Sequence, residues 1–166
     1  HFNEAVGIRA IRRAEYEDKV LRRLASALPS GVGVTVLADR GFADCGLYSL
    51  LSEELHFDFV IRFKAGTTVT AADGEVRRAG DWVPSNGRTC ELKGARITRA
   101  KYPVAAVVLV KRKDMKEAWC LASSRADEPG NVVRLYSRRF DIEHGFRDAK
   151  DRRYGFGLYY ATVGTP

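Results

Sequence analysis

One segment, residues 33–63, restricts the fold more than any other part of the chain. Residues 33–38 form a short β-branched and apolar run, which predicts a buried and parallel strand. Residues 43–55 predict a helix whose leucines face inward, and residues 57–63 predict a second strand. A strand–helix–strand order of this length predicts an α/β unit with a right-handed crossover.

The segments on both sides add a helix and a series of short strands. Residues 4–28 predict a helix with an apolar stripe that includes Leu21, Leu24 and Leu28, and Pro29-Ser30-Gly31 ends it. Residues 64–123 predict strands separated by turns. Turn sequences at 72–75 and 85–87 predict hairpins, and apolar runs at 104–110 and 119–122 predict further strands.

A helix is expected again after Pro129-Gly130, and it runs to about Lys150. The sequence therefore predicts three parts. Residues 1–63 form an α/β part, residues 64–123 a β-rich insertion, and residues 124–166 a C-terminal part that contains the last helix.

Composition excludes several classes of protein. Hydrophobic residues make up 45% of the chain, enough for a packed core. No apolar run approaches the roughly 20 residues of a membrane span, and the first residues do not resemble a signal peptide. Three widely spaced cysteines without a CxxC pair predict reduced thiols rather than disulfides or zinc ligands. We therefore expect a soluble intracellular protein without a membrane partner.

The charge distribution points to a polyanionic partner. The net charge is +7, and residues 64–120 carry 12 basic and 6 acidic side chains, a net charge of +6. A basic region of this kind is typical of proteins that bind nucleic acid. A solvated, arginine-rich surface without a partner would give the same composition, so charge alone leaves both interpretations open.

Asp39 follows the first predicted strand directly. In open α/β sheets, ligands bind beyond the carboxyl ends of the strands, so this carboxylate is a candidate metal ligand. The alternative is a structural role, in which Asp39 caps a helix or forms a salt bridge in a loop.

The last predicted helix places several polar side chains on one face. These are Tyr136, Arg139, Glu143, Arg147 and Lys150, spaced mostly by three, four and seven residues. Such a face does not suit an apolar core. It is either a solvated face with ion pairs between neighbouring turns or a site where a carboxylate holds Mg²⁺ and the cations and the phenol bind phosphate.

The spacing Tyr136-x-x-Arg139-x-x-x-Glu143-x-x-x-x-x-x-Lys150 resembles the Y-REK signature of bacterial insertion-sequence transposases of the DDE class. The segment 39–42, with the sequence DRGF, is similar to the second-aspartate motif of that family. The resemblance covers residues 20 to 166. It implies an RNase H-like, retroviral-integrase-like fold that is incomplete at its N-terminus and carries a β-rich insertion.

The resemblance also implies roles for single residues. Asp39 is the second catalytic carboxylate and Glu143 the third, and both are ligands of Mg²⁺ or Mn²⁺ in a two-metal site. The remaining candidates contact DNA: Tyr136, Arg139 and Lys150 of the signature, with Arg40 and Arg147 as additional phosphate contacts.

The activity implied is metal-dependent cleavage of transposon ends and strand transfer into target DNA, by cut and paste. The partners implied are double-stranded DNA and a second copy of the complete protein, in the bacterial cytoplasm at the nucleoid. The first aspartate of the family's triad has no counterpart here, because the only earlier one, Asp18, lies in the first predicted helix. We therefore expect a truncated fragment that does not cut DNA alone. A non-catalytic DNA-binding or dimerising remnant and another RNase H-like nuclease stay open as alternatives.

Overall fold

Five strands form the main sheet of the protein. The computed structural model describes the backbone of residues 2–142 and 145, and side chains from residue 15 onward. The sheet order is β1-β2-β9-β8-β5. In that order the strands are β1 (Thr35–Ala38), β2 (Asp58–Phe63), β9 (Trp119–Ser123), β8 (Ala106–Val110) and β5 (Thr89–Lys93).

Strands β1 and β2 are parallel, with Thr35 opposite Asp58 and Ala38 opposite Ile61. Between them lie α2 (Cys45–Ser49) and a π-helical turn (Leu50–Glu54). Asp44 starts α2, because its carboxylate accepts a hydrogen bond from the Leu47 amide at 2.9 Å. The strand–helix–strand prediction is confirmed. The other neighbouring strands of this sheet are antiparallel.

A second sheet of four short antiparallel strands has the order β4-β3-β6-β7. Its strands are β3 (Thr68–Thr70), β4 (Val76–Arg78), β6 (Arg96–Ile97) and β7 (Tyr102–Pro103), and a 3-10 turn (Ala79–Trp82) follows β4. The strands expected between 64 and 123 are thus shared between two sheets, since β5, β8 and β9 join the main one. The division of the chain into three parts stays a prediction.

One of the two predicted hairpins is confirmed and the other is wrong. The turn at 72–75 joins the antiparallel strands β3 and β4, and its Gly74 has a φ of +93°. Residues 85–87 do not join two paired strands. They lead from the 3-10 turn to β5, whose partner is β8. A turn sequence fixes a local reversal but not which strands pair on either side of it.

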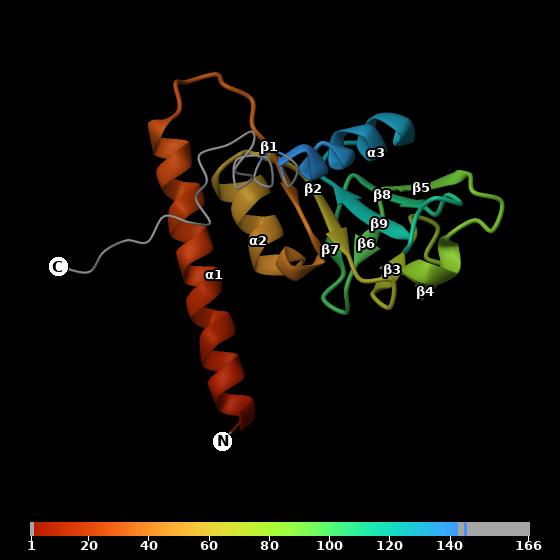
Figure 1. The fold of residues 1–166 in the computed structure, drawn as a ribbon, viewed down its shortest axis with the longest axis horizontal. Coiled ribbons are helices and arrows are strands. Elements are labelled where there is room, and N and C mark those ends of the chain that lie inside the picture. The colour runs from red at the N-terminus through yellow and green to blue at the C-terminus, as the bar shows by residue number, and fades with distance from the viewer. Residues whose placement is uncertain (1, 143–144, 146–166) are drawn as a thin grey trace, which may run out of the picture.

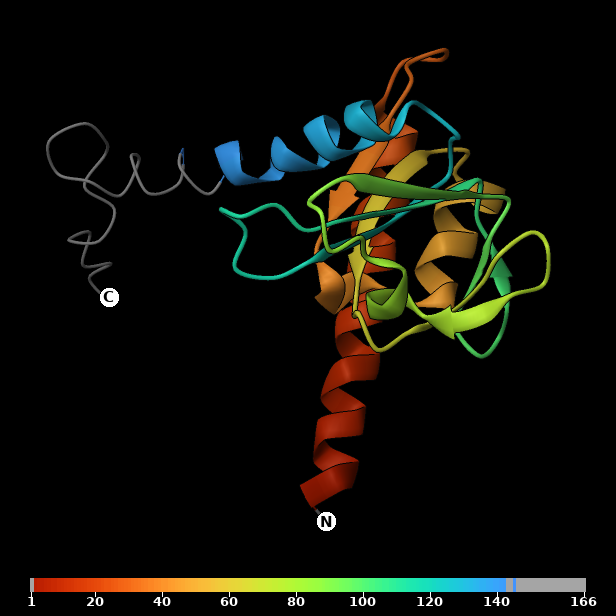
Figure 2. The same cartoon turned by 90° about the vertical axis from the view of Figure 1, so that its right-hand side faces the viewer.

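Two helical layers cover the main sheet (Figures 1 and 2). On one face, α2 and the long helix α1 (Phe2–Ala27) pack against a core that includes Phe59, Ile61 and Leu109. On the other face, α3 (Pro129–Ser137) packs against Val60, Val108 and Leu121. Strand β8 is buried along its whole length, as expected for a strand covered on both faces.

The helix predictions needed small corrections. Helix α1 contacts the core through Leu21, Ala25 and Leu28, which leaves Leu24 at the flank and 42% exposed. The last helix begins at Pro129, has a turn at Arg138 and is helical again at 139–142. Its expected continuation to Lys150 lies outside the described residues, except for Gly145, which is helical.

Two further expectations concern cysteines and membranes. Cys45, Cys90 and Cys120 are free thiols, as predicted. Among the helices of the described residues, none has the length and apolar character needed to cross a membrane.

Candidate functional site at the end of strand β1

Asp39 directly follows strand β1, at the strand end where the sequence analysis predicted a candidate metal ligand. Its backbone is extended, with φ −86° and ψ 172°, and its Oδ1 accepts a hydrogen bond from the Arg40 amide at 2.7 Å. It therefore caps the short 3-10 turn Arg40–Phe42. The side chain is 36% exposed, so capping does not remove it from contact with a ligand.

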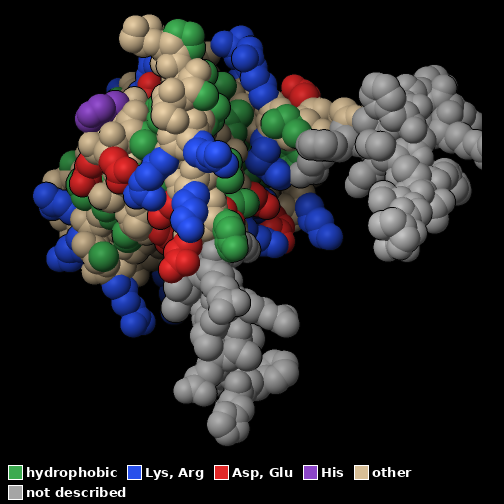
Figure 3. All heavy atoms as spheres, turned by 90° about the vertical axis from the view of Figure 1, so that its left-hand side faces the viewer, with side chains coloured by type: hydrophobic (Ala, Val, Ile, Leu, Met, Phe, Trp, Pro, Cys, Tyr) green, Lys and Arg blue, Asp and Glu red, His purple; other side chains and the backbone are tan. Residues whose placement is uncertain are grey.

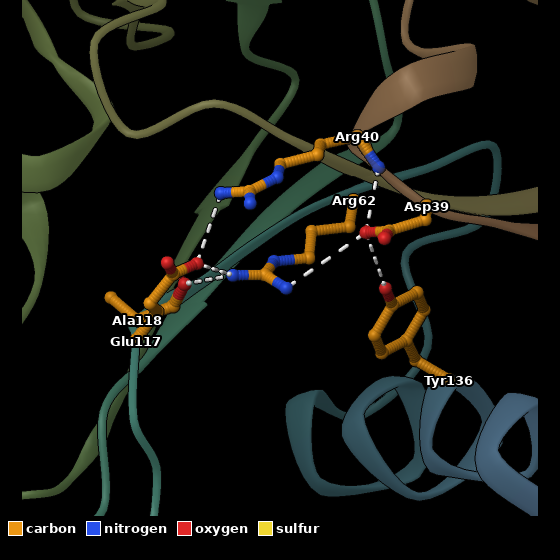
Figure 4. A network of polar contacts seen from close by, with 6 residues as sticks. All are labelled: Asp39, Arg40, Arg62, Glu117, Ala118 and Tyr136. Atoms are coloured by element: carbon orange, nitrogen blue, oxygen red, sulfur yellow. Dashed lines mark hydrogen bonds and ion pairs between the residues drawn. The ribbon is translucent and has the colours of Figure 1, made fainter.

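The side chain of Tyr136 contacts the carboxylate of Asp39. It lies in α3 and is completely buried, and its hydroxyl donates a hydrogen bond to Asp39 Oδ1 at 3.3 Å (Figure 4). The Tyr136 ring packs edge-on against Trp119, with 5.0 Å between ring centroids. The structure thus brings together one residue from each of the two motifs recognised in the sequence.

Arg139 belongs to the same site. Its guanidinium lies over the Phe140 ring at 4.7 Å and within 5.8 Å of the Tyr136 centroid. Its positive charge is also one of the causes that lower the pKa of Asp39. Stacking on an aromatic face holds a guanidinium in place while its N–H groups stay directed toward acceptors.

Sequence reasoning missed two residues of the site, Arg62 and Glu117. Arg62 Nη1 is 3.8 Å from Asp39 Oδ1, and its Nη2 donates to Glu117 Oε2 at 2.8 Å. Arg40 Nη1 donates to the same Glu117 oxygen at 3.0 Å (Figure 4). A signal for Arg62 was present, because an arginine interrupts the otherwise apolar end of the strand at 57–63. Glu117 has no such signal, since it is one charge among several in a loop.

Burial and charge act against each other on the acidity of Asp39. Partial burial would raise the pKa of its carboxyl group, but the Arg40 amide, the charges of Arg139 and Arg62 and the Tyr136 hydroxyl together lower it. Burial and the nearby Asp39 charge raise the pKa of Tyr136. At neutral pH the pair is therefore an ionised carboxylate and a neutral phenol that donates to it.

An open pocket of about 780 Å³ lies beside this network. We call it the basic pocket, because five of its lining residues are cationic: Arg40, Arg62, Arg112, Lys116 and Arg134. Trp119 and Phe140 also line it, and their rings stack at 5.6 Å. Two acidic residues, Asp114 and Glu117, line the pocket as well. The face that carries α1 also mixes basic and acidic side chains (Figure 3).

Asp39 fits the role of one metal ligand. The contacts of Asp39 with the Arg40 amide, the Tyr136 hydroxyl and Arg62 fall on Oδ1, and carboxylate oxygens are the ligands that Mg²⁺ prefers in proteins. The described residues contain no group of three or more His, Cys, Asp or Glu side chains that could hold a metal ion. Glu143, Arg147 and Lys150, the other predicted site residues, lie outside the described residues.

Comparison with known protein families assigns most of the chain to one family. The family model described as the transposase DDE domain matches residues 12–158, which is most of the chain. The matched range contains Asp39, Tyr136 and Arg139 and extends over Glu143 and Lys150. No curated protein matches the chain.

Proposed function

The chain belongs to the family of transposase DDE domains, and from this premise we propose that it carries two of the metal-binding carboxylates of a DNA transposase. Asp39 and Glu143 are the proposed ligands of Mg²⁺ or Mn²⁺. The family acts by nucleotidyl transfer in general. The cut-and-paste reaction at transposon ends, the Y-REK subtype and an RNase H-like fold are the finer parts of this proposal.

One observation carries the proposal: the contact between Asp39 and Tyr136. A carboxylate at the end of a parallel strand is a common cap and indicates little alone. Here it is kept ionised and receives a hydrogen bond from the motif tyrosine at 3.3 Å. In the sequence, Glu143 follows this tyrosine by seven residues. The parallel pairing of β1 and β2, with helices on both faces of the sheet, supports an RNase H-like arrangement.

The proposed division of labour follows from the chemistry of each side chain. Asp39 and Glu143 hold the metal ions, which when bound polarise the scissile phosphodiester and its attacking oxygen. Arg40, Arg139, Arg147 and Lys150 bind phosphate oxygens. Tyr136, which the sequence predicted to contact DNA, is buried and donates to Asp39, so its proposed role is to orient Asp39. The proposed DNA partners are transposon ends and target, with a homodimer as the working form.

Metal binding tests this assignment. Mn²⁺ binding followed by electron paramagnetic resonance should weaken at least tenfold in Asp39→Asn and in Glu143→Gln. Glu75→Gln is the matched control, because Glu75 lies in the β3–β4 hairpin and pairs with Arg77. Equal Mn²⁺ binding by the wild type and both site variants would contradict the proposal.

DNA binding separates the proposal from a non-catalytic remnant. A transposase site should hold a DNA duplex more tightly with Mg²⁺ than without it, and Asp39→Asn should remove the difference. A remnant would bind the duplex equally in both conditions. Fluorescence anisotropy with a labelled duplex at fixed ionic strength measures both cases.

A further inference from the structure

Two arginines converge on a single oxygen atom in the basic pocket. Arg40 Nη1 lies 3.0 Å and Arg62 Nη2 lies 2.8 Å from Oε2 of Glu117. The two arginines come from different elements, the turn after β1 and strand β2. Their guanidinium groups therefore define a point in space where a negatively charged oxygen is bound.

The three side chains differ in how firmly they are held. Arg62 is only 13% exposed and is fixed by Asp39 on one side and by the Ala118 carbonyl, at 3.3 Å, on the other. Glu117 is 48% exposed and lies in the loop between β8 and β9. The half-exposed pair of Arg40 and Glu117 contributes little to stability. Because Glu117 is half-exposed in a loop, water can solvate its carboxylate when it leaves, while Asp39 and the Ala118 carbonyl keep Arg62 in place.

We propose that Arg40 and Arg62 form a phosphate-binding site, and that the Glu117 carboxylate occupies it until a phosphate group of nucleic acid displaces it. The identity of the ligand as nucleic acid rests on the proposed function; the anion site itself rests on the geometry. A phosphodiester presents a single negative charge on two acceptor oxygens, as a carboxylate does, and arginine binds it through two parallel N–H groups.

The surroundings favour this ligand. The site opens into the basic pocket, where Arg112, Lys116 and Arg134 add positive charge. Arg62 also reaches Asp39, so a phosphate bound between Arg40 and Arg62 would lie next to the proposed metal ligand. Glu117 thus acts as a positioning residue in the free protein and as a competitor of phosphate during binding.

Inorganic phosphate is the first probe, because it tests the anion site without DNA. Trp119 lines the same pocket, and in a Trp82→Phe background it is the only tryptophan. Phosphate is titrated at constant ionic strength while its fluorescence is recorded. Glu117→Gln should lower the Kd for phosphate about three- to tenfold, the effect of removing one competing charge from a partly exposed site.

Two variants control this experiment. Glu75→Gln changes the net charge by the same amount in the other sheet and should leave the Kd unchanged. Adding Arg62→Gln to Glu117→Gln should abolish the gain. Weaker or unchanged phosphate binding in Glu117→Gln would overturn the proposal, because Glu117 would then only support Arg62. A circular dichroism spectrum and melting temperature equal to those of the wild type show that the variant is folded.

A DNA duplex is the second probe. Glu117→Gln should bind it about three- to tenfold more tightly, with a salt slope steeper by about one unit, since one phosphate contact forms without breaking an internal pair. If the variants respond to phosphate as expected but no variant binds the duplex, the proposed function fails and the anion site stands. If the wild type binds the duplex and Glu117→Gln gains nothing for either probe, the anion site fails alone.

Discussion

The hydroxyl oxygen of Tyr136 lies 3.3 Å from Oδ1 of Asp39, although 97 positions separate the two residues in the chain. The contact joins the end of β1 to α3 across the edge of the main sheet. It ties the local geometry of the candidate site to the packing of the fold, because the Tyr136 ring is a core residue. One substitution that removes only the hydroxyl and another that also removes the ring can therefore distinguish the contribution of Tyr136 to the site from its contribution to the core.

Tyr136→Phe should cost about 0.5–1.5 kcal/mol of unfolding free energy, the net value of one hydrogen bond. It should also raise the pKa of Asp39, since the hydroxyl helps to lower it. Tyr136→Ala, which also removes the buried ring, should cost about 3–5 kcal/mol. Urea unfolding measures the free energies, and NMR titration of the Asp39 carboxyl measures the pKa. Equal losses in the two variants would contradict the assignment.

The acidity of Asp39 predicts a pH dependence of stability. The folded state lowers the pKa of Asp39, so the ionised carboxylate stabilises the fold above the unfolded pKa of about 3.9. This contribution is lost as the pH falls through the lower folded pKa. The difference in unfolding free energy between the wild type and Asp39→Asn should therefore shrink below about pH 4. A difference that is constant from neutral to acidic pH would show that Asp39 titrates normally.

Arg62 and Arg40 share Glu117 but differ in burial, with side chains 13% and 51% exposed. Arg62→Met should cost about 1–2 kcal/mol, because its removal leaves Asp39 and Glu117 with fewer partners in a half-buried site. Arg40→Met should change stability by less than about 0.5 kcal/mol, as expected for an exposed ion pair. Urea midpoints of the two variants provide the comparison, and a larger loss for Arg40→Met would reverse it.

Cys120 tests the position of β9 within the main sheet. Its side chain is completely buried, and burial raises the pKa of its thiol to about 11. Iodoacetamide at pH 8 should therefore modify Cys45 in the folded protein and leave Cys120 unmodified, since only the accessible thiolate reacts. Mass spectrometry of the peptides shows which cysteine is modified. In urea all three cysteines should react, and rapid modification of Cys120 without urea would exclude a buried β9.

The sequence predicted local elements well and long-range pairing poorly. The parallel pair β1 and β2 follows from strand–helix–strand spacing, and Asp39 follows from its place at a strand end. The local sequence pattern does not predict that β5, β8 and β9 belong to the main sheet. Any of the short strands after residue 63 has side chains that suit a strand in either sheet. Turn sequences specify reversals but not partners, which is why the hairpin at 85–87 was wrong.

For the candidate site, too, the sequence predicted local features better than long-range contacts. Tyr136 and Arg139 were identified from their spacing, and the structure places both next to Asp39. Arg62 and Glu117 were missed because their roles depend on contacts 55 positions apart in the chain. Fixed spacing within one helix survives as a readable pattern. Two charges brought together by sheet pairing leave no such pattern in a single sequence.

The location of Arg62 has a consequence for motion at the site. Its strand β2 pairs with β1 on one side and with β9 on the other, so its backbone amides open only when the sheet itself opens. The loop that carries Glu117 lies beyond the ends of β8 and β9. Amide hydrogen exchange should accordingly be slow at 59–62 and fast at 111–117. The rate at which this site rearranges would then be set by motion of the loop that carries Glu117, while Arg62 stays fixed in the sheet.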